Sequence, residues 1–206
     1  MNILCYGDSN TWGLNPAGGR WPRDVRWTGR LAQLLGDGCY VIEDGLCGRT
    51  TVFNDVFVEG REGSAQLAVT LDKHDPLDLV ILALGINDCA LTFGATPAIS
   101  ARGIDKLIRI VKGMTYRDGG VPKILVMCPP PTAPNIEDGP FPGYNKESYV
   151  RSTQLAPYYK AVADQYGCLF FDAGTVAKAS DCDKLHMEKE SHEAIAQALA
   201  KIIQNA

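Results

Sequence analysis

Residues 79–84, Leu-Val-Ile-Leu-Ala-Leu, form an almost unbroken apolar run near the middle of the chain. A strand with one face in water alternates polar and apolar side chains, whereas a strand covered on both faces can be apolar throughout. The run therefore predicts a central strand of a parallel sheet, which we place at Leu77–Leu84. Four other short apolar runs predict further strands: Ile3–Tyr6, Tyr40–Glu43, Lys123–Cys128 and Cys168–Phe171.

Helical patterns separate most of these predicted strands. Apolar residues recur at three- and four-residue spacing, as in amphipathic helices. The segments that show such patterns are Arg26–Leu35, Pro97–Met114, Glu147–Tyr166 and Lys189–Ile203. Alternating strands and helices predict an α/β fold, in which a doubly wound parallel sheet of about five strands lies between two layers of helices. A length of 206 residues suits one such domain, so we expect residues 1–206 to form a single three-layer sandwich.

The composition argues against several functional classes. A net charge of −4 and a pI near 5.4 argue against a nucleic-acid binder, which needs a basic stripe, and against an anionic membrane surface as partner. Seven cysteines, an odd number without a Cys-x-x-Cys pair, favour reduced thiols over disulfides or a metal site. Met1 leads almost directly into the first predicted strand and no apolar run approaches a membrane span, so we expect a cytoplasmic protein.

A serine follows the first predicted strand in the tripeptide Gly7-Asp8-Ser9. Glycine permits a tight exit from the strand, and the serine would then begin the next helical turn. A serine hydroxyl is a weak nucleophile near neutral pH and needs a base within hydrogen-bond reach. The alternative is that Asp8 and Ser9 only cap the turn that follows.

A carboxylate and an imidazole stand three residues apart near the other end of the chain, at Asp183 and His186. At this spacing the acid can accept the ring N–H while the other ring nitrogen faces a serine. The other two histidines are less suited to this role. His74 lies in a polar segment that resembles solvated surface, and His192 is expected to pack within the last helix or cap it.

Two further turns follow predicted strands and carry candidate oxyanion donors. Asn87, in Gly85-Ile86-Asn87-Asp88, can donate an amide N–H to a developing negative charge. Gly48 can offer its backbone N–H, because a missing side chain allows close approach. The alternative for both is an ordinary turn residue. Asp88 is expected to cap a turn or helix, and Arg49 to form a structural ion pair.

The four elements occur along the chain in the order Ser9, Gly48, Asn87 and the pair Asp183/His186. With these blocks in this order, the chain resembles the SGNH (GDSL-type) hydrolases. The resemblance covers essentially the whole length, and it is stronger for the arylesterase/acyltransferase branch. The segments that carry it are Gly7-Asp8-Ser9-Asn10-Thr11-Trp12-Gly13, Asp24-Val25-Arg26-Trp27-Thr28-Gly29, Gly45-Leu46-Cys47-Gly48-Arg49-Thr50-Thr51, Pro76-Leu77-Asp78-Leu79-Val80, Gly85-Ile86-Asn87-Asp88, Pro129-Pro130-Pro131 and Asp183-Lys184-Leu185-His186.

This resemblance implies a flavodoxin-like fold of the SGNH type and a serine hydrolase mechanism. It implies Ser9 as nucleophile, His186 as base and Asp183 as the acid that orients it. The implied oxyanion hole comprises the Ser9 N–H, the Gly48 N–H and the Asn87 side chain. The resemblance also implies a homo-oligomer, and the predicted acyl-transfer mechanism needs no metal or other cofactor.

The chain departs from the family pattern at two positions. Lys184 stands where the family often has glycine, which affects the expected shape of the loop rather than the chemistry. Asn10 replaces the more usual aliphatic residue after the serine, which affects the pocket floor.

The expected pocket lies at the carboxyl edge of the sheet, where such folds bind ligands. Residues 13–25 and 129–146 are rich in glycine and proline, follow predicted strands and are expected to form its walls. We expect Asp8, Asn10 and Trp12, which flank the serine, to contact the substrate. The sequence leaves pocket lining and packing equally open for Trp12 and Trp21, and Trp27 is expected to pack in the core.

The predicted reaction is hydrolysis of short-chain acyl esters, acetyl or aryl, through an acyl-enzyme, with transfer to other alcohols as a further outcome. The substrate is expected to be a small ester. Carbohydrate acetylesterase, thioesterase and lysophospholipase remain open as alternatives within the family. From a different class, a flavodoxin-like module could cradle a phosphate at residues 7–13, although that loop lacks the lysine of a Walker motif. A scaffold that keeps the fold without turnover is the third alternative.

Overall fold

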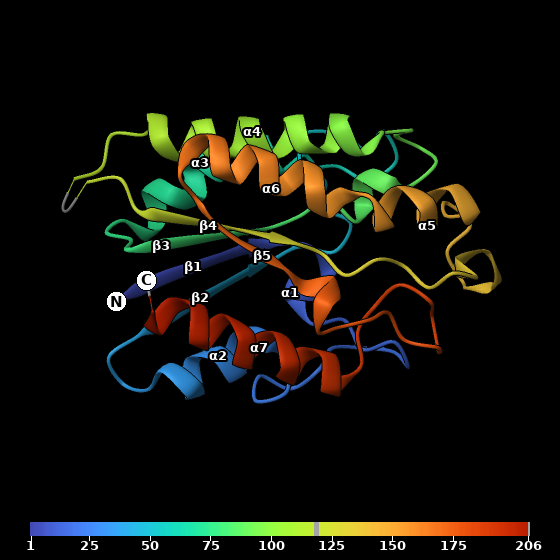
Figure 1. The fold of residues 1–206 in the computed structure, drawn as a ribbon, viewed down its shortest axis with the longest axis horizontal. Helices are drawn as coiled ribbons and strands as arrows, with labels where there is room; N and C mark the ends of the chain where they lie inside the picture. The colour runs from blue at the N-terminus through green and yellow to red at the C-terminus, as the bar shows by residue number, and fades with distance from the viewer. Residues whose placement is uncertain (118–119, 206) are drawn as a thin grey trace.

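Five parallel strands form one sheet in the order β2-β1-β3-β4-β5 (Figure 1). The computed structural model describes residues 1–117 and 120–205. The strands are β1 (Asn2–Gly7), β2 (Tyr40–Gly45), β3 (Leu79–Ala83), β4 (Lys123–Cys128) and β5 (Leu169–Asp172). All five predicted strands are therefore present, with ends that shift by at most two residues, and the predicted α/β fold is confirmed.

Helices cover both faces of this sheet. In Figure 1, α3, α4, α5 and α6 lie above the sheet, and α2 and α7 lie below it. The helices of the described chain are α1 (Ser9–Trp12), α2 (Trp27–Leu35), α3 (Gly63–His74), α4 (Pro97–Gly113), α5 (Lys146–Thr153), α6 (Leu155–Tyr166) and α7 (Lys189–Gln204). Short 3-10 turns occur at η1 (Asn87–Cys89), η2 (Ile136–Asp138) and η3 (Ala173–Thr175).

The core consists of two apolar clusters, one on each face of the sheet, and β3 contributes to both. The residues of β3 are all buried, and successive side chains point to opposite faces. Val80 and Leu82 join the cluster beneath α3, α4 and α6, whereas Leu79 and Ile81 join the cluster against α2 and α7. The apolar run at 79–84 is thus covered on both sides, as its composition predicts.

The strand order reverses at β1, which makes the carboxyl edge of the sheet the expected ligand-binding side. β2 lies on one side of β1 and β3 on the other, so the connections that leave β1 and β3 diverge. Open α/β sheets bind ligands where the order reverses in this way. Gly7 at the end of β1 pairs with Ala83 of β3 and with Gly45 of β2, so three of the predicted blocks begin side by side.

Two helix predictions need correction. The segment Glu147–Tyr166 is two helices, α5 and α6, because Gln154 ends the first and precedes the second. Helix α3 was not predicted at all. Its buried face includes Ser64 and Thr70 while Val69 is 70% exposed, so the apolar periodicity is weak.

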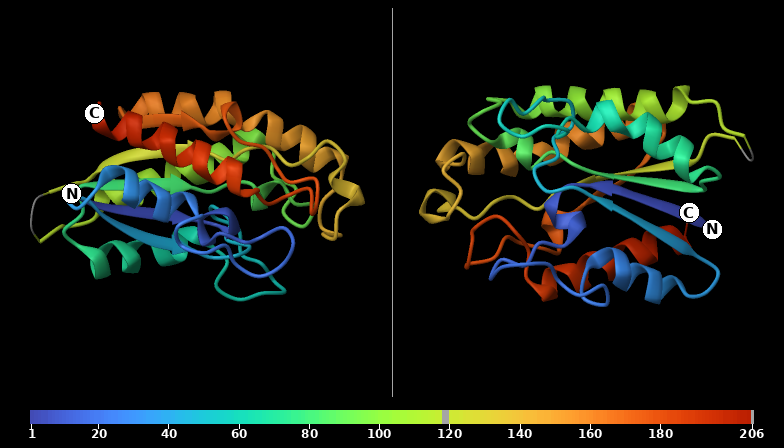
Figure 2. Two further views of the ribbon diagram at one scale, coloured as in Figure 1. Left: turned by 90° about the horizontal axis from the view of Figure 1, so that it is seen from below. Right: turned by 180° about the vertical axis from the view of Figure 1, so that it is seen from behind.

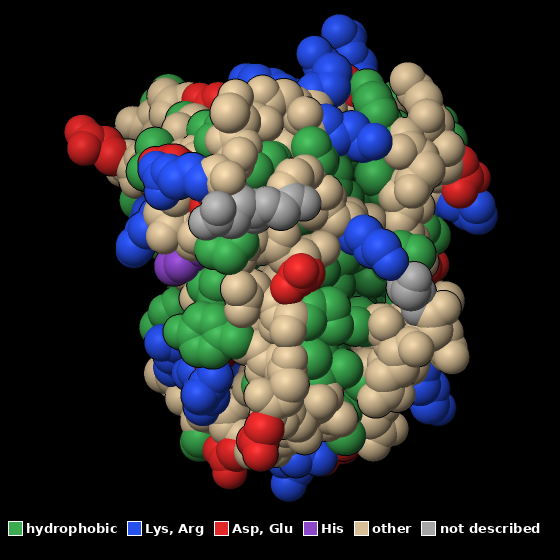
Figure 3. Space-filling view, turned by 90° about the vertical axis from the view of Figure 1, so that its left-hand side faces the viewer, with side chains coloured by type: hydrophobic (Ala, Val, Ile, Leu, Met, Phe, Trp, Pro, Cys, Tyr) green, Lys and Arg blue, Asp and Glu red, His purple; other side chains and the backbone are tan. Residues whose placement is uncertain are grey.

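Apolar side chains reach the surface at the amino edge of the sheet, opposite the edge that carries Ser9. Figure 3 shows this face, with hydrophobic side chains in its centre and lysine or arginine around them. Exposed apolar residues at this end include Met1 and Tyr40. None of the described helices combines the length and apolar content needed to cross a bilayer. The cysteines are all free thiols.

Candidate active site

Ser9 lies at the tight turn that leads from β1 into α1. An added Cβ at Gly7 would lie 2.0 Å from the Thr11 hydroxyl oxygen, so the chain can leave the strand this way only with glycine. Asp8 caps α1 by accepting a hydrogen bond from the Asn10 backbone N–H at 2.9 Å. The capping interpretation is therefore correct for Asp8. Ser9 is the first residue of the helix, so its own N–H has no partner inside the helix.

The two ends of the chain meet at this turn. Ser9 Oγ lies 2.8 Å from His186 Nε2, although 177 positions separate the two residues. His186 Nδ1 lies 2.7 Å from Asp183 Oδ2. All three side chains are buried, with residue exposures of 3–4%. The hydroxyl, the imidazole and the carboxylate thus form one continuous hydrogen-bonded relay.

Asp183 is held as the charged acid of this relay. Burial alone would raise the pKa of its carboxyl, but hydrogen bonds from the His186 ring and from the backbone N–H groups of Leu185 and His186 outweigh it and lower the pKa. The two backbone bonds reach Oδ1 at 3.0 and 2.9 Å, which leaves Oδ2 to face the ring. A charged acid here fixes the tautomer with the proton on Nδ1 and leaves Nε2 free to accept from Ser9.

Lys184 adopts the backbone conformation that favours glycine. Its φ is +69°, the only left-handed non-glycine residue within residues 1–117 and 120–205. Its backbone carbonyl accepts from Ala133 N at 2.8 Å and its N–H donates to Ser180 at 3.0 Å. These bonds hold the turn, in which Asp183 and His186 keep their contact of 2.7 Å.

Asn87 follows β3 and faces the loop after β2. Its Nδ2 donates to the Arg49 carbonyl at 2.9 Å, and its Oδ1 accepts from the Tyr144 hydroxyl at 2.9 Å. An amide nitrogen carries two hydrogens, so one N–H remains beyond the bond to Arg49. Gly48, one residue before Arg49, has a left-handed φ of +77°, which only glycine adopts readily.

Buried charged residues fix the loop that carries Gly48. Arg49 forms an ion pair with Asp44 at 2.7 Å and donates to the Gly7 carbonyl at 2.9 Å. Asp88 accepts from both the backbone N–H and the hydroxyl of Thr51, at 2.9 and 2.6 Å. Burial raises the pKa of the Asp88 carboxyl to about 7, despite these hydrogen bonds. Arg49 is thus the structural ion-pair partner that the sequence predicts.

A sequence model of the GDSL-like Lipase/Acylhydrolase family matches residues 5–194. The chain belongs to this family. Comparison with curated proteins gives no match.

Solved structures similar to this GDSL-like family member include esterases. Est24, a carbohydrate acetylesterase from Sinorhizobium meliloti, is 38% identical, with 100% of this chain and 99% of that chain covered and a TM-score of 0.92. The native aryl esterase of M. smegmatis is also 38% identical, with 100% and 99% covered and a TM-score of 0.89. The predicted resemblance to the SGNH hydrolases and their arylesterase branch is therefore confirmed.

The predicted substrate contacts lie beside Ser9, but two of them are almost fully enclosed. Asp8 is 1% exposed and Asn10 is 6% exposed. Burial raises the pKa of Asp8 to about 6, although the hydrogen bond from Asn10 opposes this. Within the described residues, Asp8 Oδ2 and both amide atoms of Asn10 have no hydrogen-bond partner. Trp12 is half-buried, with the Arg20 guanidinium 4.7 Å from its ring centroid.

The other tryptophans and histidines lie outside the relay of Ser9, His186 and Asp183. Trp27 is fully buried in the core, as predicted, and its backbone N–H donates to His192 Nδ1 at 3.3 Å. Burial lowers the pKa of His192 to about 4. Trp21 is half-buried and donates through its indole N–H to the Met187 carbonyl at 3.2 Å. His74 lies in the last turn of α3.

The sequence did not single out two aromatic residues of the segment 129–146. Phe141 packs its ring edge-to-face on the His186 imidazole, with centroids 5.4 Å apart, and Tyr144 bonds to Asn87 as described. The segment was predicted as a pocket wall from its prolines and its place after β4. Its irregular backbone has no period from which an inward-facing side chain could be read.

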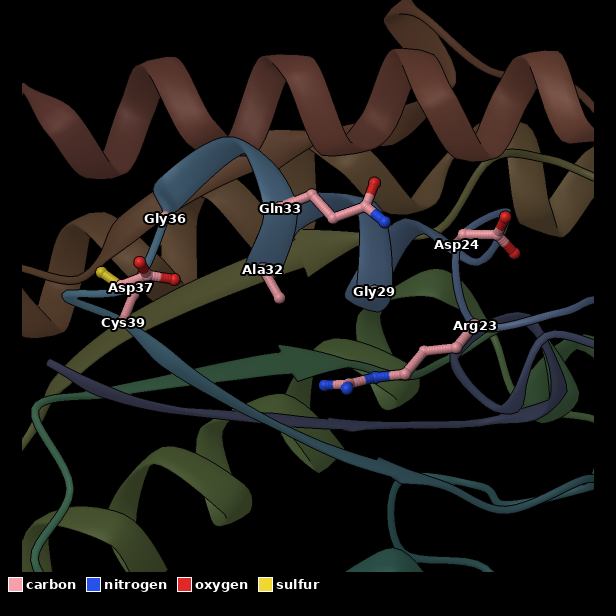
Figure 4. Close-up of a pocket in the computed structure, with 8 residues that line it drawn as sticks. All are labelled: Arg23, Asp24, Gly29, Ala32, Gln33, Gly36, Asp37 and Cys39. Atoms are coloured by element: carbon pink, nitrogen blue, oxygen red, sulfur yellow. The ribbon is translucent and has the colours of Figure 1, made fainter.

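A separate pocket of about 680 Å³ lies beside α2 (Figure 4). Its lining includes Arg23, Asp24, Gln33 and Asp37 but no residue of the relay. It extends to Cys39 near the start of β2, whereas the relay lies beyond the ends of the strands. Within the described residues, no group of three or more His, Cys, Asp or Glu side chains is arranged to hold a metal ion.

Proposed function

We propose that this protein is a serine esterase that hydrolyses short-chain acyl esters through an acyl-enzyme. The observation that carries the proposal is the continuous relay from Asp183 through His186 to Ser9, with contacts of 2.7 and 2.8 Å. Its place at the carboxyl edge of the sheet, next to donors from two other loops, supports the same conclusion.

The geometry supports a two-step acyl transfer. Ser9 Oγ attacks the ester carbonyl carbon while His186 Nε2 takes its proton, and Asp183 stabilises the imidazolium. The Ser9 N–H, the Gly48 N–H and the Asn87 amide stabilise the oxyanion. His186 then gives the proton to the leaving alcohol. A water molecule attacks the acyl carbon in the second step, with His186 as base, and regenerates the free serine.

The similar proteins narrow the proposed substrate. One is named as a carbohydrate acetylesterase and another as an aryl esterase, and both align over the whole chain. We therefore propose acetyl or other short acyl esters of sugars or aromatic alcohols, ahead of thioesters or lysophospholipids. Another alcohol that replaces water in the second step would make the protein an acyltransferase.

Substitution of Ser9 by alanine tests the function. We expect the kcat for p-nitrophenyl acetate to fall on the order of 10⁶-fold, because nucleophile and base act as a unit. A fluorophosphonate probe should label the wild-type protein at Ser9, seen by peptide mass spectrometry. Hydrolysis by the Ser9→Ala protein at the wild-type rate would overturn the proposal, as would a wild-type protein that neither turns over esters nor reacts with the probe.

We further propose that the protein is a cytoplasmic homo-oligomer. An apolar loop tip supports self-association: Val56, Phe57 and Val58 are 76%, 82% and 44% exposed. The tip belongs to the connection between β2 and α3, which also carries Gly48. A second copy that covered this tip would remove apolar surface from water close to the active-site edge.

A further inference from the structure

Two different partners hold the Asn87 amide, and one of them, the Arg49 carbonyl, selects its orientation. The Arg49 carbonyl can only accept a hydrogen bond, so it requires Nδ2 on its side. On the other side the Tyr144 hydroxyl lies 2.9 Å from Oδ1 and donates to it. An amide rotated by half a turn would place Oδ1 against the Arg49 carbonyl, would lose that bond, and would make the Tyr144 hydroxyl an acceptor instead of a donor.

This orientation matters because the amide has two chemically opposite ends. With Nδ2 held as observed, its second N–H is available for the oxyanion proposed above. With the amide rotated, Oδ1 would lie where Nδ2 lies now, and its partial negative charge would repel the developing oxyanion. The bond from Tyr144 to Oδ1 also polarises the amide, and chains of hydrogen bonds strengthen one another in a buried site.

We infer that Tyr144 is a positioning residue that anchors and polarises the Asn87 amide for oxyanion stabilisation. The inference rests on the proposed serine-esterase function. Tyr144 acts through Asn87, so it is not itself a catalytic residue. The assignment also gives a role to the segment 129–146, for which the sequence predicted only a wall.

The surroundings of Tyr144 keep its hydroxyl in place. Its backbone N–H donates to Phe141 at 3.1 Å, and the Phe141 and Tyr144 rings meet edge-to-face with centroids 6.5 Å apart. The preceding residue, Gly143, accepts from Leu91 N at 2.8 Å, which ties the segment to the chain that follows Asn87. Burial raises the pKa of the Tyr144 phenol well above its usual value, so the hydroxyl keeps its proton.

A double-mutant cycle with Tyr144→Phe and Asn87→Ala tests the inference. In the wild-type background, Tyr144→Phe should lower kcat for p-nitrophenyl acetate about tenfold, the effect of one lost hydrogen bond, with KM changed less than twofold. In the Asn87→Ala background the same change should alter kcat less than twofold, since no amide remains to anchor. A general packing defect would lower kcat by the same factor in both backgrounds.

A tetrahedral inhibitor gives an independent measurement. Phenylboronic acid adds to a serine hydroxyl and places an oxygen where the oxyanion forms, so Tyr144→Phe should raise its Ki about tenfold. Tyr149→Phe, in the same apolar cluster, is the control and should change neither kcat nor Ki. Wild-type behaviour of Tyr144→Phe, or equal losses in both backgrounds, would overturn the role of Tyr144. Failure of the esterase proposal would show differently, as a wild-type activity that Ser9→Ala does not abolish.

Discussion

At the scale of single residues, the buried carboxyl of Asp88 links the fold to pH. Asp88 is fully buried, and burial raises the pKa of its carboxyl to about 7 in spite of its bonds to Thr51. An unfolded aspartate titrates near 4. Between these values the native state binds a proton that the unfolded state has lost, so this group lowers the free energy of unfolding as pH rises from 4 to 7. Below pH 4 the carboxyl is protonated in both states, so it no longer affects the free energy of unfolding.

Replacing Asp88 by asparagine should remove this pH dependence. We expect the wild type to lose stability from pH 4 to pH 7 relative to Asp88→Asn. The unfolding free energy of the variant minus that of wild type should therefore rise over this range, by a few kcal/mol at most. Urea unfolding at four pH values across that range measures the shift. The control is Asp181→Asn, whose side chain is 94% exposed and whose curve should run parallel to wild type. Parallel curves for Asp88→Asn too would contradict the prediction.

Lys184 offers a second prediction at this scale. A residue with a Cβ at φ +69° is strained, and glycine would relieve the strain. We expect Lys184→Gly to stabilise the protein by about 1 kcal/mol, or about 2–4 °C in Tm, with kcat unchanged. Lys184→Ala keeps a Cβ at the same φ and should give no gain. A Lys184→Gly protein that melts no higher than Lys184→Ala would show that the turn stores no such strain.

At the scale of elements, the sequence predicts best where one physical signal dominates. The strand at β3 was predictable because a doubly covered strand must be apolar. The boundary between α5 and α6 was missed, although Arg151–Gln154 are polar and Pro157 has no N–H to donate in a continuous helix. Helix α3 lacked a clear apolar face because it buries small polar residues such as Ser64 and Thr70.

The start of α5 allows a prediction about helix capping. The Asn145 side chain accepts from Glu147 N and Ser148 N at 2.9 and 3.2 Å, and the Ser148 hydroxyl accepts from Asn145 N at 3.3 Å. Asn145→Ala should lower the unfolding free energy by about 1 kcal/mol. Asn145→Asp keeps the acceptor and should stay close to wild type. Thermal melts of the three proteins decide the matter, and equal melting temperatures would refute the role of this cap.

At the scale of the whole molecule, the site is assembled from loops that only the sheet brings together. Ser9 follows β1, Gly48 follows β2, Asn87 follows β3, and the turn with His186 leads into α7. Figure 2 shows two further views of these connections at one end of the sheet. The Ser9, Asp183 and His186 set was predictable because its residue types and order are those of a family. The contact between Tyr144 and Asn87 was not, because it depends on the path of an irregular segment.

The exposed loop tip gives the last prediction, also at this scale. If Phe57 lies in the interface of the proposed homo-oligomer, Phe57→Asp should place a charge in apolar contact and shift the mass by light scattering towards one chain. The side chain is 82% exposed, so the fold should tolerate the change. Val69→Asp is the matched control, because Val69 is also exposed, at 70%, but lies on α3. An unchanged mass for Phe57→Asp would move the interface elsewhere, and a wild-type mass of one chain at micromolar concentration would exclude the oligomer.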